Sequence, residues 1–267
     1  MIKLTDMTFS IEPIAREYVY RRFKLASVPE KEKIIKDWAN KIEDSKLLVR
    51  DFEERVGKVQ RKKILDVGSG PGGVSIAFAL AGADMYGVDI EKELYDISLV
   101  YAKEYGVKVN FSLYEGSKLP FSDNTFDYAV SVSVIEHTTD PELYLSEILR
   151  VTKPGGKLYL GFPNKLAWKE THTGIWFLTY KPGFLRPFII RMLGRNPLPE
   201  NNLHFYTYFD LLRILRRVRS GDYSWHLLPE EGKAQKGFKK FVKNMLGFFG
   251  LSYKAFLPHI LVILEKR

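Results

Sequence analysis

The sequence predicts an α/β fold built on one doubly wound, mostly parallel β-sheet. Short apolar segments with the character of buried strands alternate with helical segments from residue 62 to residue 164. Such alternation is typical of parallel βαβ units. The 267 residues are 45% hydrophobic, enough for one large domain with a sizeable core. The absence of cysteine excludes disulfides, zinc–thiolate sites and a cysteine nucleophile.

The elements follow one another in a regular order. Residues 10–57 are charged and carry apolar positions at helical spacing, which predicts an N-terminal helical arm over residues 1–60. The core follows at residues 61–164. Its expected strands lie at 62–68, 84–90, 106–113, 126–137 and 156–164, and its helices lie at 73–83, 91–105 and from 141 to a glycine turn at 155–156.

The alternation breaks after Asn164, the residue that ends the fifth strand. Residues 165–206 are aromatic, basic and punctuated by Pro and Gly, and they are too long for a plain connection. We expect them to form a cap inserted after the fifth strand. Residues 207–267 then complete the core, with a helix at 208–220, a strand at 222–229, a basic amphipathic helix at 237–251 and a strand at 258–267.

The net charge of +9 is concentrated in the last part of the chain. Residues 161–267 carry 18 Lys and Arg against 7 Asp and Glu, whereas residues 1–160 carry 23 against 25. A basic surface of this kind attracts nucleic acid, a lipid head group or a phosphorylated substrate, or it is only a solvated face. No signal-peptide core and no apolar run long enough to span a bilayer are seen, which predicts a cytoplasmic protein.

The stretch ILDVGSGPGG, residues 64–73, spaces three glycines as G-x-G-x-x-G between a strand and a helix. This spacing fits a dinucleotide-binding turn and also a site for S-adenosylmethionine. Asp66 favours the second ligand, because a carboxylate there would repel a pyrophosphate but can accept hydrogen bonds from a cationic amino acid. Asp66 could also tie the turn to its own backbone. Asp89, at the end of the second strand, suits a ribose diol in either case, or the N-cap of the next helix.

Four motifs in order resemble the class I S-adenosylmethionine-dependent methyltransferases, in the broad group of the ubiquinone and menaquinone methyltransferases. They are LDVGSGPGG, YGVDI, YEGSKLPFSDNTFDYAVSVSVIEH and EILRVTKPGGKLYLGFPN, and together they cover residues 63–164. The resemblance implies a Rossmann-like sheet of seven strands, in which residues 258–266 form the antiparallel seventh strand. It also implies S-adenosylmethionine as the cofactor and methyl transfer as the activity.

Carried over position by position, the resemblance implies a set of cofactor-binding residues. Residues of the glycine turn would surround the methionine part, and Asp89 would bind the ribose with Ile90 near the adenine. Glu115 stands where the family usually has Asp, which contacts the adenine amino group; the Gly116 amide could serve instead. The implied set is Asp66, Gly68, Ser69, Gly70, Asp89, Ile90, Glu115, Gly116, Ser131 and Ser133.

The catalytic residues are expected after the fourth strand and in the cap. Some relatives hold a divalent metal with two Glu and a His, but here Ser133 replaces the first Glu in SVIEH, and we expect no metal. In methyl transfer from a sulfonium the protein mainly positions the acceptor, and an oxygen acceptor usually needs a base. The candidates are His137, His172 and Tyr206, each of which could instead be structural.

The acceptor is suggested by the cap, which mixes aromatic residues with Lys181, Arg186, Arg191 and Arg195. A basic amphipathic segment can lie on an anionic membrane surface or clasp a large apolar acceptor, or it is a lid packed on the sheet. We expect a small-molecule or lipid-like acceptor, with the protein at a membrane surface. An RNA-binding or RNA-modifying protein is the alternative, because basic and aromatic residues suit single strands. A nicotinamide oxidoreductase is disfavoured by Asp66.

Overall fold

The computed structural model describes residues 11–24, 26–167, 175–193, 204, 206–218, 223–228 and 257–267. The chain divides into two compact units, Met1–Val130 and Ser131–Arg267, which are taken in turn below. The borders expected at residues 60, 164 and 206 stay predictions. Among the described residues, no helix has the length and apolar character needed to cross a bilayer.

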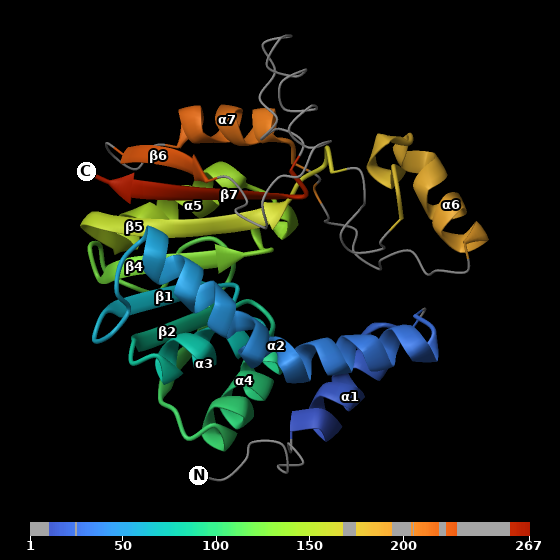
Figure 1. Ribbon diagram of the computed structural model, residues 1–267, viewed down its shortest axis with the longest axis horizontal. Helices are drawn as coiled ribbons and strands as arrows, with labels where there is room; N and C mark the ends of the chain where they lie inside the picture. Colours follow the sequence, from blue (N-terminus) through green and yellow to red (C-terminus); the bar gives the residue numbers. More distant parts are fainter. Residues whose placement is uncertain are drawn as a thin grey trace, which may run out of the picture. The chain divides into compact units, whose positions relative to one another are not determined.

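The strands form one seven-stranded sheet in the order β3-β2-β1-β4-β5-β7-β6 (Figure 1). β1 pairs in parallel with β2 and β4, and β2 pairs in parallel with β3. β7 runs antiparallel to both β5 and β6. This confirms the expected Rossmann-like, mostly parallel sheet. The strands are β1 (Lys63–Val67), β2 (Asp84–Asp89), β3 (Val109–Leu113), β4 (Phe126–Val132), β5 (Thr152–Pro163), β6 (Tyr223–Leu228) and β7 (His259–Lys266).

The first unit packs helices against its parallel strands. α3 (Gly73–Leu80) connects β1 to β2, and α4 (Lys92–Glu104) connects β2 to β3. β1 is buried along almost its whole length, as expected for a strand covered on both faces. β3 comes very close to β2 at Gly87, where an added Cβ would lie 2.6 Å from the Phe111 ring, so any larger residue would require this ring to move.

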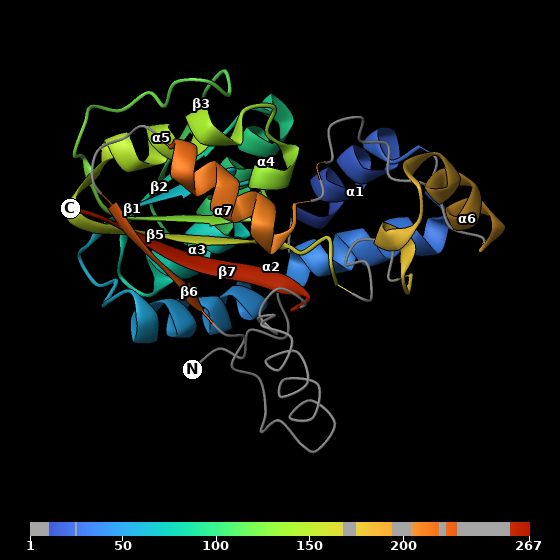
Figure 2. The same ribbon diagram turned by 90° about the horizontal axis from the view of Figure 1, so that it is seen from above.

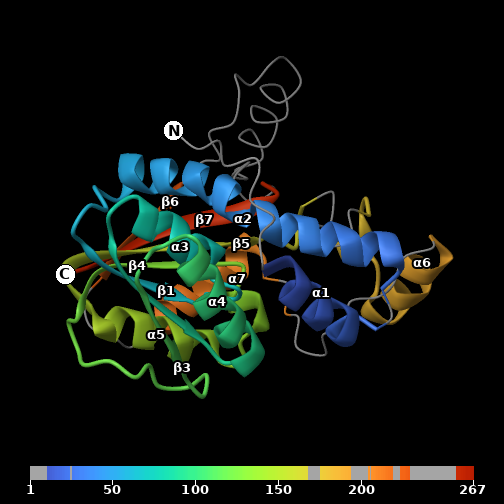
Figure 3. The same cartoon turned by 90° about the horizontal axis from the view of Figure 1, so that it is seen from below.

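The N-terminal segment is helical, as predicted, and forms α1 (Ile11–Arg22) and α2 (Val28–Arg55). α2 begins at Ser27 with a capping box completed by Glu30. It lies along α3 (Figure 3), where the Phe52 and Phe78 rings meet edge to face at 5.0 Å. α1 reaches the first turn of α4, where the Tyr18 hydroxyl donates to Glu91 Oε1 at 2.8 Å.

The second unit contains α5 (Pro141–Val151), whose N-cap Asp140 accepts the Leu143 N–H. The expectation that a glycine turn separates this helix from β5 is wrong. The helix ends at Val151 and the strand begins at once, so the Pro-Gly-Gly stretch lies inside β5. Gly155 takes a φ of +74° there, so the glycine still meets a backbone requirement, but within the strand.

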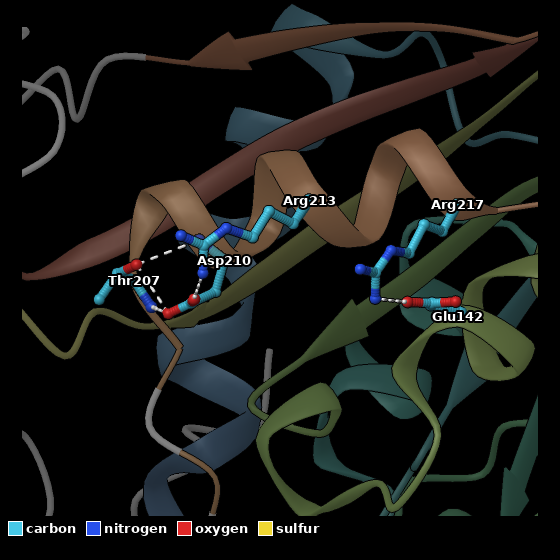
Figure 4. A network of polar contacts seen from close by, with 5 residues as sticks. All are labelled: Glu142, Thr207, Asp210, Arg213 and Arg217. Carbon is cyan, nitrogen blue, oxygen red and sulfur yellow. Dashed lines mark hydrogen bonds and ion pairs between the residues drawn. The ribbon is translucent and has the colours of Figure 1, made fainter.

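The late strands and α7 (Tyr208–Arg217) complete the second unit, with β7 between β5 and β6 (Figure 2). α7 is capped by Thr207, whose hydroxyl accepts the Asp210 N–H at 3.1 Å (Figure 4). Arg217, at the other end of α7, contacts Glu142 of α5 at 3.4 Å. The helix expected at 237–251 lies outside the described residues. The described residues between β5 and α7 include the short helices η3 (Leu178–Tyr180), η4 (Gly183–Leu185) and α6 (Arg186–Met192).

Candidate functional site

The turn after β1 is held together by its own backbone. The N–H groups of Gly68 and Ser69 both donate to the Val88 carbonyl of β2, at 2.8 and 2.9 Å. The φ angles of Gly68, Gly70 and Gly72 are +78°, +52° and +89°, a region that side chains with a Cβ rarely enter. Three glycines are therefore required by the path of the chain itself.

The third glycine required by this path is Gly72, which the G-x-G-x-x-G pattern passes over. A Cβ on Gly72 would lie 3.0 Å from the Phe111 ring and from Ser98 Cβ. Gly73, the last glycine of the pattern, has an ordinary backbone but lies under α2. A Cβ there would come within 2.7 Å of the Lys41 side chain. Gly73 thus serves packing, whereas Gly72 shapes the turn.

Gly70 lies at the open point of the turn and is held by Asp89. A Cβ at Gly70 would meet no atom of the described chain within 4 Å. The buried Asp89 accepts the Gly70 N–H on Oδ2 at 2.8 Å and the Glu91 N–H on Oδ1 at 2.9 Å. The N-cap of α4 is Glu91, so the alternative that Asp89 caps this helix is wrong. Asp89 instead joins the turn after β1 to the turn after β2.

Asp66 is buried beneath the same turn. Its Oδ2 accepts the hydroxyl proton of Ser75, in the first turn of α3, at 2.7 Å. Burial raises the pKa of Asp66 to about 7, and the charge of Asp89 adds to this, while Ser75 and the Lys41 ammonium oppose it. The carboxyl therefore ties the turn to α3, as one alternative expected. A positive charge near Asp66 would stabilise its ionised form.

The remaining expected cofactor residues of the first unit lie at the ends of β2 and β3. Ile90 is an exposed apolar side chain, and a Cβ on Gly116 would touch its Cγ2 at 3.5 Å. Glu115 is exposed beside them. Tyr114, which sequence analysis missed, donates its N–H to the Asp89 carbonyl at 3.1 Å. Burial, with the charge of Asp89, raises the pKa of Tyr114 to about 12, so this phenol stays protonated at neutral pH.

The two serines at the end of β4 differ in their surroundings. The Ser131 hydroxyl is buried and shares a 2.8 Å hydrogen bond with the Tyr144 hydroxyl of α5. Ser133 is exposed, takes a φ of +60° and donates its N–H to the Gly161 carbonyl at 2.8 Å. The Ser131 side chain thus serves helix packing, and only Ser133 presents a side chain to solvent. Their assignment to the cofactor stays a prediction.

In the second unit, residues from the two ends of the expected cap meet next to the short helix η2 (Ile135–His137). The carbonyl of Glu136 accepts the His204 N–H at 2.7 Å, and the carbonyl of Tyr206 accepts the Lys165 N–H at 2.9 Å. The Tyr206 ring lies 6.4 Å from Phe162 of β5 and 6.1 Å from His204. Two expected catalytic positions, Tyr206 and the η2 segment, are thereby brought together.

The charges around Tyr206 are negative. Burial, together with the carboxylates of Asp210, Glu136 and Asp140, raises the pKa of Tyr206 above its usual value. The phenol is therefore a hydrogen-bond donor at neutral pH and a poor base. Glu136 itself is 2% exposed, which is rare for a carboxylate. Sequence analysis weighed Glu136 only as a metal ligand and missed it as a neighbour of Tyr206.

The other catalytic candidates are placed less fully. His137 is half-buried at the end of η2. His172 lies outside the described residues. Within the described ranges, no group of three or more His, Cys, Asp or Glu side chains is arranged to hold a metal ion. The catalytic assignment of His137, His172 and Tyr206 stays a prediction.

Asn164, which follows β5, has a structural position. It is buried, and its Nδ2 donates to the Leu257 carbonyl at 2.7 Å while Oδ1 accepts the Leu166 N–H at 3.0 Å. Its own N–H donates to the Pro258 carbonyl at 2.9 Å. The side chain therefore fastens the end of β5 to the segment that leads into β7.

Residues 65–160 match the family model described as a methyltransferase domain. The chain is 31% identical over 115 residues to the ubiquinone biosynthesis O-methyltransferase of Bordetella avium, covering 43% of this chain and 48% of the relative. It is 37% identical over 106 residues to the demethylmenaquinone methyltransferase of Renibacterium salmoninarum, covering 39% and 43%. The matched part thus spans less than half the length of these curated relatives.

Among solved structures, the fold is similar to that of a SAM-dependent methyltransferase, possible histamine N-methyltransferase, from Thermotoga maritima. The TM-score is 0.54 at 17% identity, over 94% of this chain and 99% of that one. At this identity the likeness concerns the fold alone.

Proposed function

We propose that this chain transfers the methyl group of S-adenosylmethionine to an oxygen of a small-molecule or lipid-like acceptor, because residues 65–160 match the model of a methyltransferase domain. The observation that carries the proposal is the pairing of Gly70 and Asp89. A glycine with open space beside it, fixed by a buried carboxylate, forms a turn that a ligand can approach closely.

The chemistry of the turn fits S-adenosylmethionine. The ligand carries an ammonium and a sulfonium and no phosphate, and the turn offers two carboxyl groups, Asp66 and Asp89. Each Asp89 oxygen accepts one backbone N–H, which leaves lone pairs for the two hydroxyls of a ribose. The exposed Ile90 provides an apolar surface for the adenine.

The cofactor, when bound, supplies an activated methyl group on its sulfonium. The chain has to hold the acceptor in line with that methyl and exclude water. In the proposal Tyr206 orients the acceptor by donating a hydrogen bond, because its raised pKa keeps the phenol protonated. His137 is then the better candidate to take the proton from an acceptor hydroxyl. His172 is the second candidate for this role.

The acceptor class rests on two observations. The curated relatives are named for ubiquinone biosynthesis and for demethylmenaquinone, and from these names we carry over a small-molecule acceptor. The segment after β5 exposes many aromatic side chains between basic residues, which suits a lipid-like molecule at a membrane surface. An RNA acceptor would be served by the same basic residues and is separated by experiment.

Calorimetry of the full chain tests the cofactor. S-adenosylmethionine and S-adenosylhomocysteine are expected to bind, and NAD is not. Tight binding of NAD without binding of S-adenosylmethionine would overturn the proposal. Incubation of a cell extract with tritiated S-adenosylmethionine and the protein then tests the acceptor. Label in the lipid or small-molecule fraction is expected, whereas label confined to RNA would establish the alternative.

A further inference from the structure

Residues 175–193, here called the aromatic segment, expose an unusual number of large apolar side chains. The segment contains η3, η4 and α6 and belongs to the second unit. Monomeric proteins rarely leave so many apolar side chains in solvent within so short a stretch. The exposed residues are Trp176, Phe177, Tyr180, Phe184, Leu185, Phe188, Met192 and Leu193.

This exposure is not the result of a missing core, because the segment has one of its own. Ile175, Leu178 and Ile190 are buried together, with Ile189 packed against them. The remaining apolar residues therefore point away from a core that is already formed. Burial of the exposed side chains against another part of the chain is therefore not needed to explain how the segment folds.

The segment is also fastened by polar contacts. The Arg186 guanidinium donates to the carbonyls of Thr179 and Lys181, at 2.9 and 3.0 Å. The Tyr180 hydroxyl donates to the Leu166 carbonyl at 2.6 Å, close to the end of β5. These contacts stabilise the backbone that carries the exposed side chains. Arg186 is one of the residues that make them.

Three of the exposed side chains form a row along η4 and α6. Phe184, Phe188 and Met192 follow one another at intervals of four residues and are 81%, 61% and 71% exposed. In a helix, this spacing places side chains above one another on one face. Ile190 lies on the other side, in the small core. The row is therefore an exposed apolar face of three large side chains.

The charges of the segment select the partner. Its 19 residues contain Lys181, Arg186 and Arg191 and no acidic residue. Lys181 and Arg191 are exposed beside the apolar row. Exposed apolar side chains accompanied by cations match a bilayer whose head groups are anionic. Trp and Tyr prefer the boundary between the lipid head groups and the acyl chains. α6 is far too short to span the bilayer.

We propose that the aromatic segment is a docking surface for an anionic lipid bilayer, with Phe184, Phe188 and Met192 inserted and Lys181 and Arg191 at the phosphates. Docking does not depend on methyl transfer, so either can fail without the other. If both hold, docking brings the second unit to the surface where a lipid-like acceptor is found.

Co-sedimentation of the full chain with vesicles tests the surface. Vesicles of phosphatidylcholine mixed with phosphatidylglycerol are expected to bind the chain, and salt or pure phosphatidylcholine is expected to weaken binding. Phe184→Ser and Phe188→Ser should each reduce the apparent affinity by about tenfold or more. Phe209→Ser is the matched control, because Phe209 is a 45% exposed phenylalanine on α7, outside the segment. Equal losses in segment and control variants would overturn the proposal.

The contribution of charge is tested in the same way. Arg191→Glu should weaken binding to the anionic vesicles but not to the neutral ones. Arg216→Glu makes the same change at an exposed position on α7 and should weaken binding much less. If both variants lose affinity equally, binding depends only on net charge and the aromatic segment is not the docking surface.

The absence of cysteine allows a direct test of insertion. Met192→Cys carrying an environment-sensitive fluorophore should shift to the blue on anionic vesicles, and Phe209→Cys should not. This readout serves even where a serine variant fails to fold. A blue shift at Met192 that appears when only the protein concentration is raised, together with a dimer detected by light scattering, would assign the surface to a second copy of the chain. That result would overturn the proposal. Calorimetry with S-adenosylmethionine on each variant keeps the cofactor result separate.

Discussion

The turn after β1 and the chain after β5 both follow a strand of the same sheet, but they are held by different means. After β1, glycines with positive φ and backbone hydrogen bonds close the turn within five residues, Gly68–Gly72, and a single carboxylate, Asp89, holds the Gly70 N–H. After β5, the side chains of Asn164, Tyr180 and Arg186 instead donate hydrogen bonds to carbonyl groups. A backbone path with positive φ restricts the residue to glycine, whereas a carbonyl can be reached by many side chains.

The largest effect is expected where the backbone path meets the ligand. Gly70→Ala should weaken the binding of S-adenosylmethionine about ten- to a hundredfold, because the methyl enters the space beside the turn and the φ of +52° is strained. Gly106→Ala is the control, since Gly106 has a φ of +64° and a Cβ there meets no described atom within 4 Å. Both should lose about 1–2 kcal/mol of unfolding free energy, but only the first should lose affinity in calorimetry. If the two variants bind S-adenosylmethionine equally well, the ligand does not lie beside Gly70.

A second large effect concerns the pH dependence of stability. Burial raises the pKa of Asp66 to about 7, far above its ordinary value, so the folded chain holds a proton that the unfolded chain releases. The contribution of Asp66 to the unfolding free energy is fully present below about pH 4. It is lost as the pH rises towards 7, by up to about 1.4 kcal/mol per pH unit. Asp66→Asn should remove this loss. Denaturant unfolding of the unchanged protein and of the variant at pH 5 and pH 8 measures this loss. If the unfolding free energies of the two proteins change equally with pH, Asp66 does not hold a proton in the folded state.

Loss of a side-chain tie after β5 should cost less. Asn164→Ala removes two hydrogen bonds from a buried side chain and should lower the unfolding free energy by about 2 kcal/mol. Asn110→Ala is a fitting comparison, because the half-buried Asn110 makes one long contact, 3.4 Å, with the Met85 carbonyl. Urea unfolding should rank the two variants in this order. The reverse order would mean that the connection to Leu257 does not stabilise the sheet.

The smallest effects belong to the surface contacts of α7. Thr207→Ala removes the N-cap and should cost about 1 kcal/mol, because a capped N–H returns to water. Arg217→Gln breaks an exposed ion pair with Glu142 and should cost less than about 0.5 kcal/mol. Thermal unfolding of both variants checks the ranking. A larger loss for Arg217 would show that this pair, and not the cap, fixes α7.

The sequence predicts those parts of the molecule in which residue type is dictated locally. The alternation of strands and helices gave every described strand of the sheet, and the glycine pattern gave the turn. Gly72 and Tyr114 escaped detection because their contacts are distant in sequence: Gly72 lies against Phe111 of β3, and Tyr114 bonds to Asp89 of β2. The boundary of α5 was misplaced since a Pro-Gly-Gly stretch can bend a strand as well as end a helix.

The site in the second unit was harder to predict for the same reason. Asn164 meets Leu257, which follows 93 residues later, and no local pattern announces that pairing. Likewise, Glu136 and His204 are joined across the whole cap. A single sequence shows which side chains could bond but not which distant carbonyl will be presented to them.

The position of β7 has a consequence for how the chain is made. β7 lies between β5 and β6 although it follows both in sequence, and β6 is an edge strand of the sheet. During synthesis β5 and β6 leave the ribosome before their common partner exists, whereas β1, β2 and β3 already have one another. The nascent chain therefore carries an open edge of β5 while its first unit condenses.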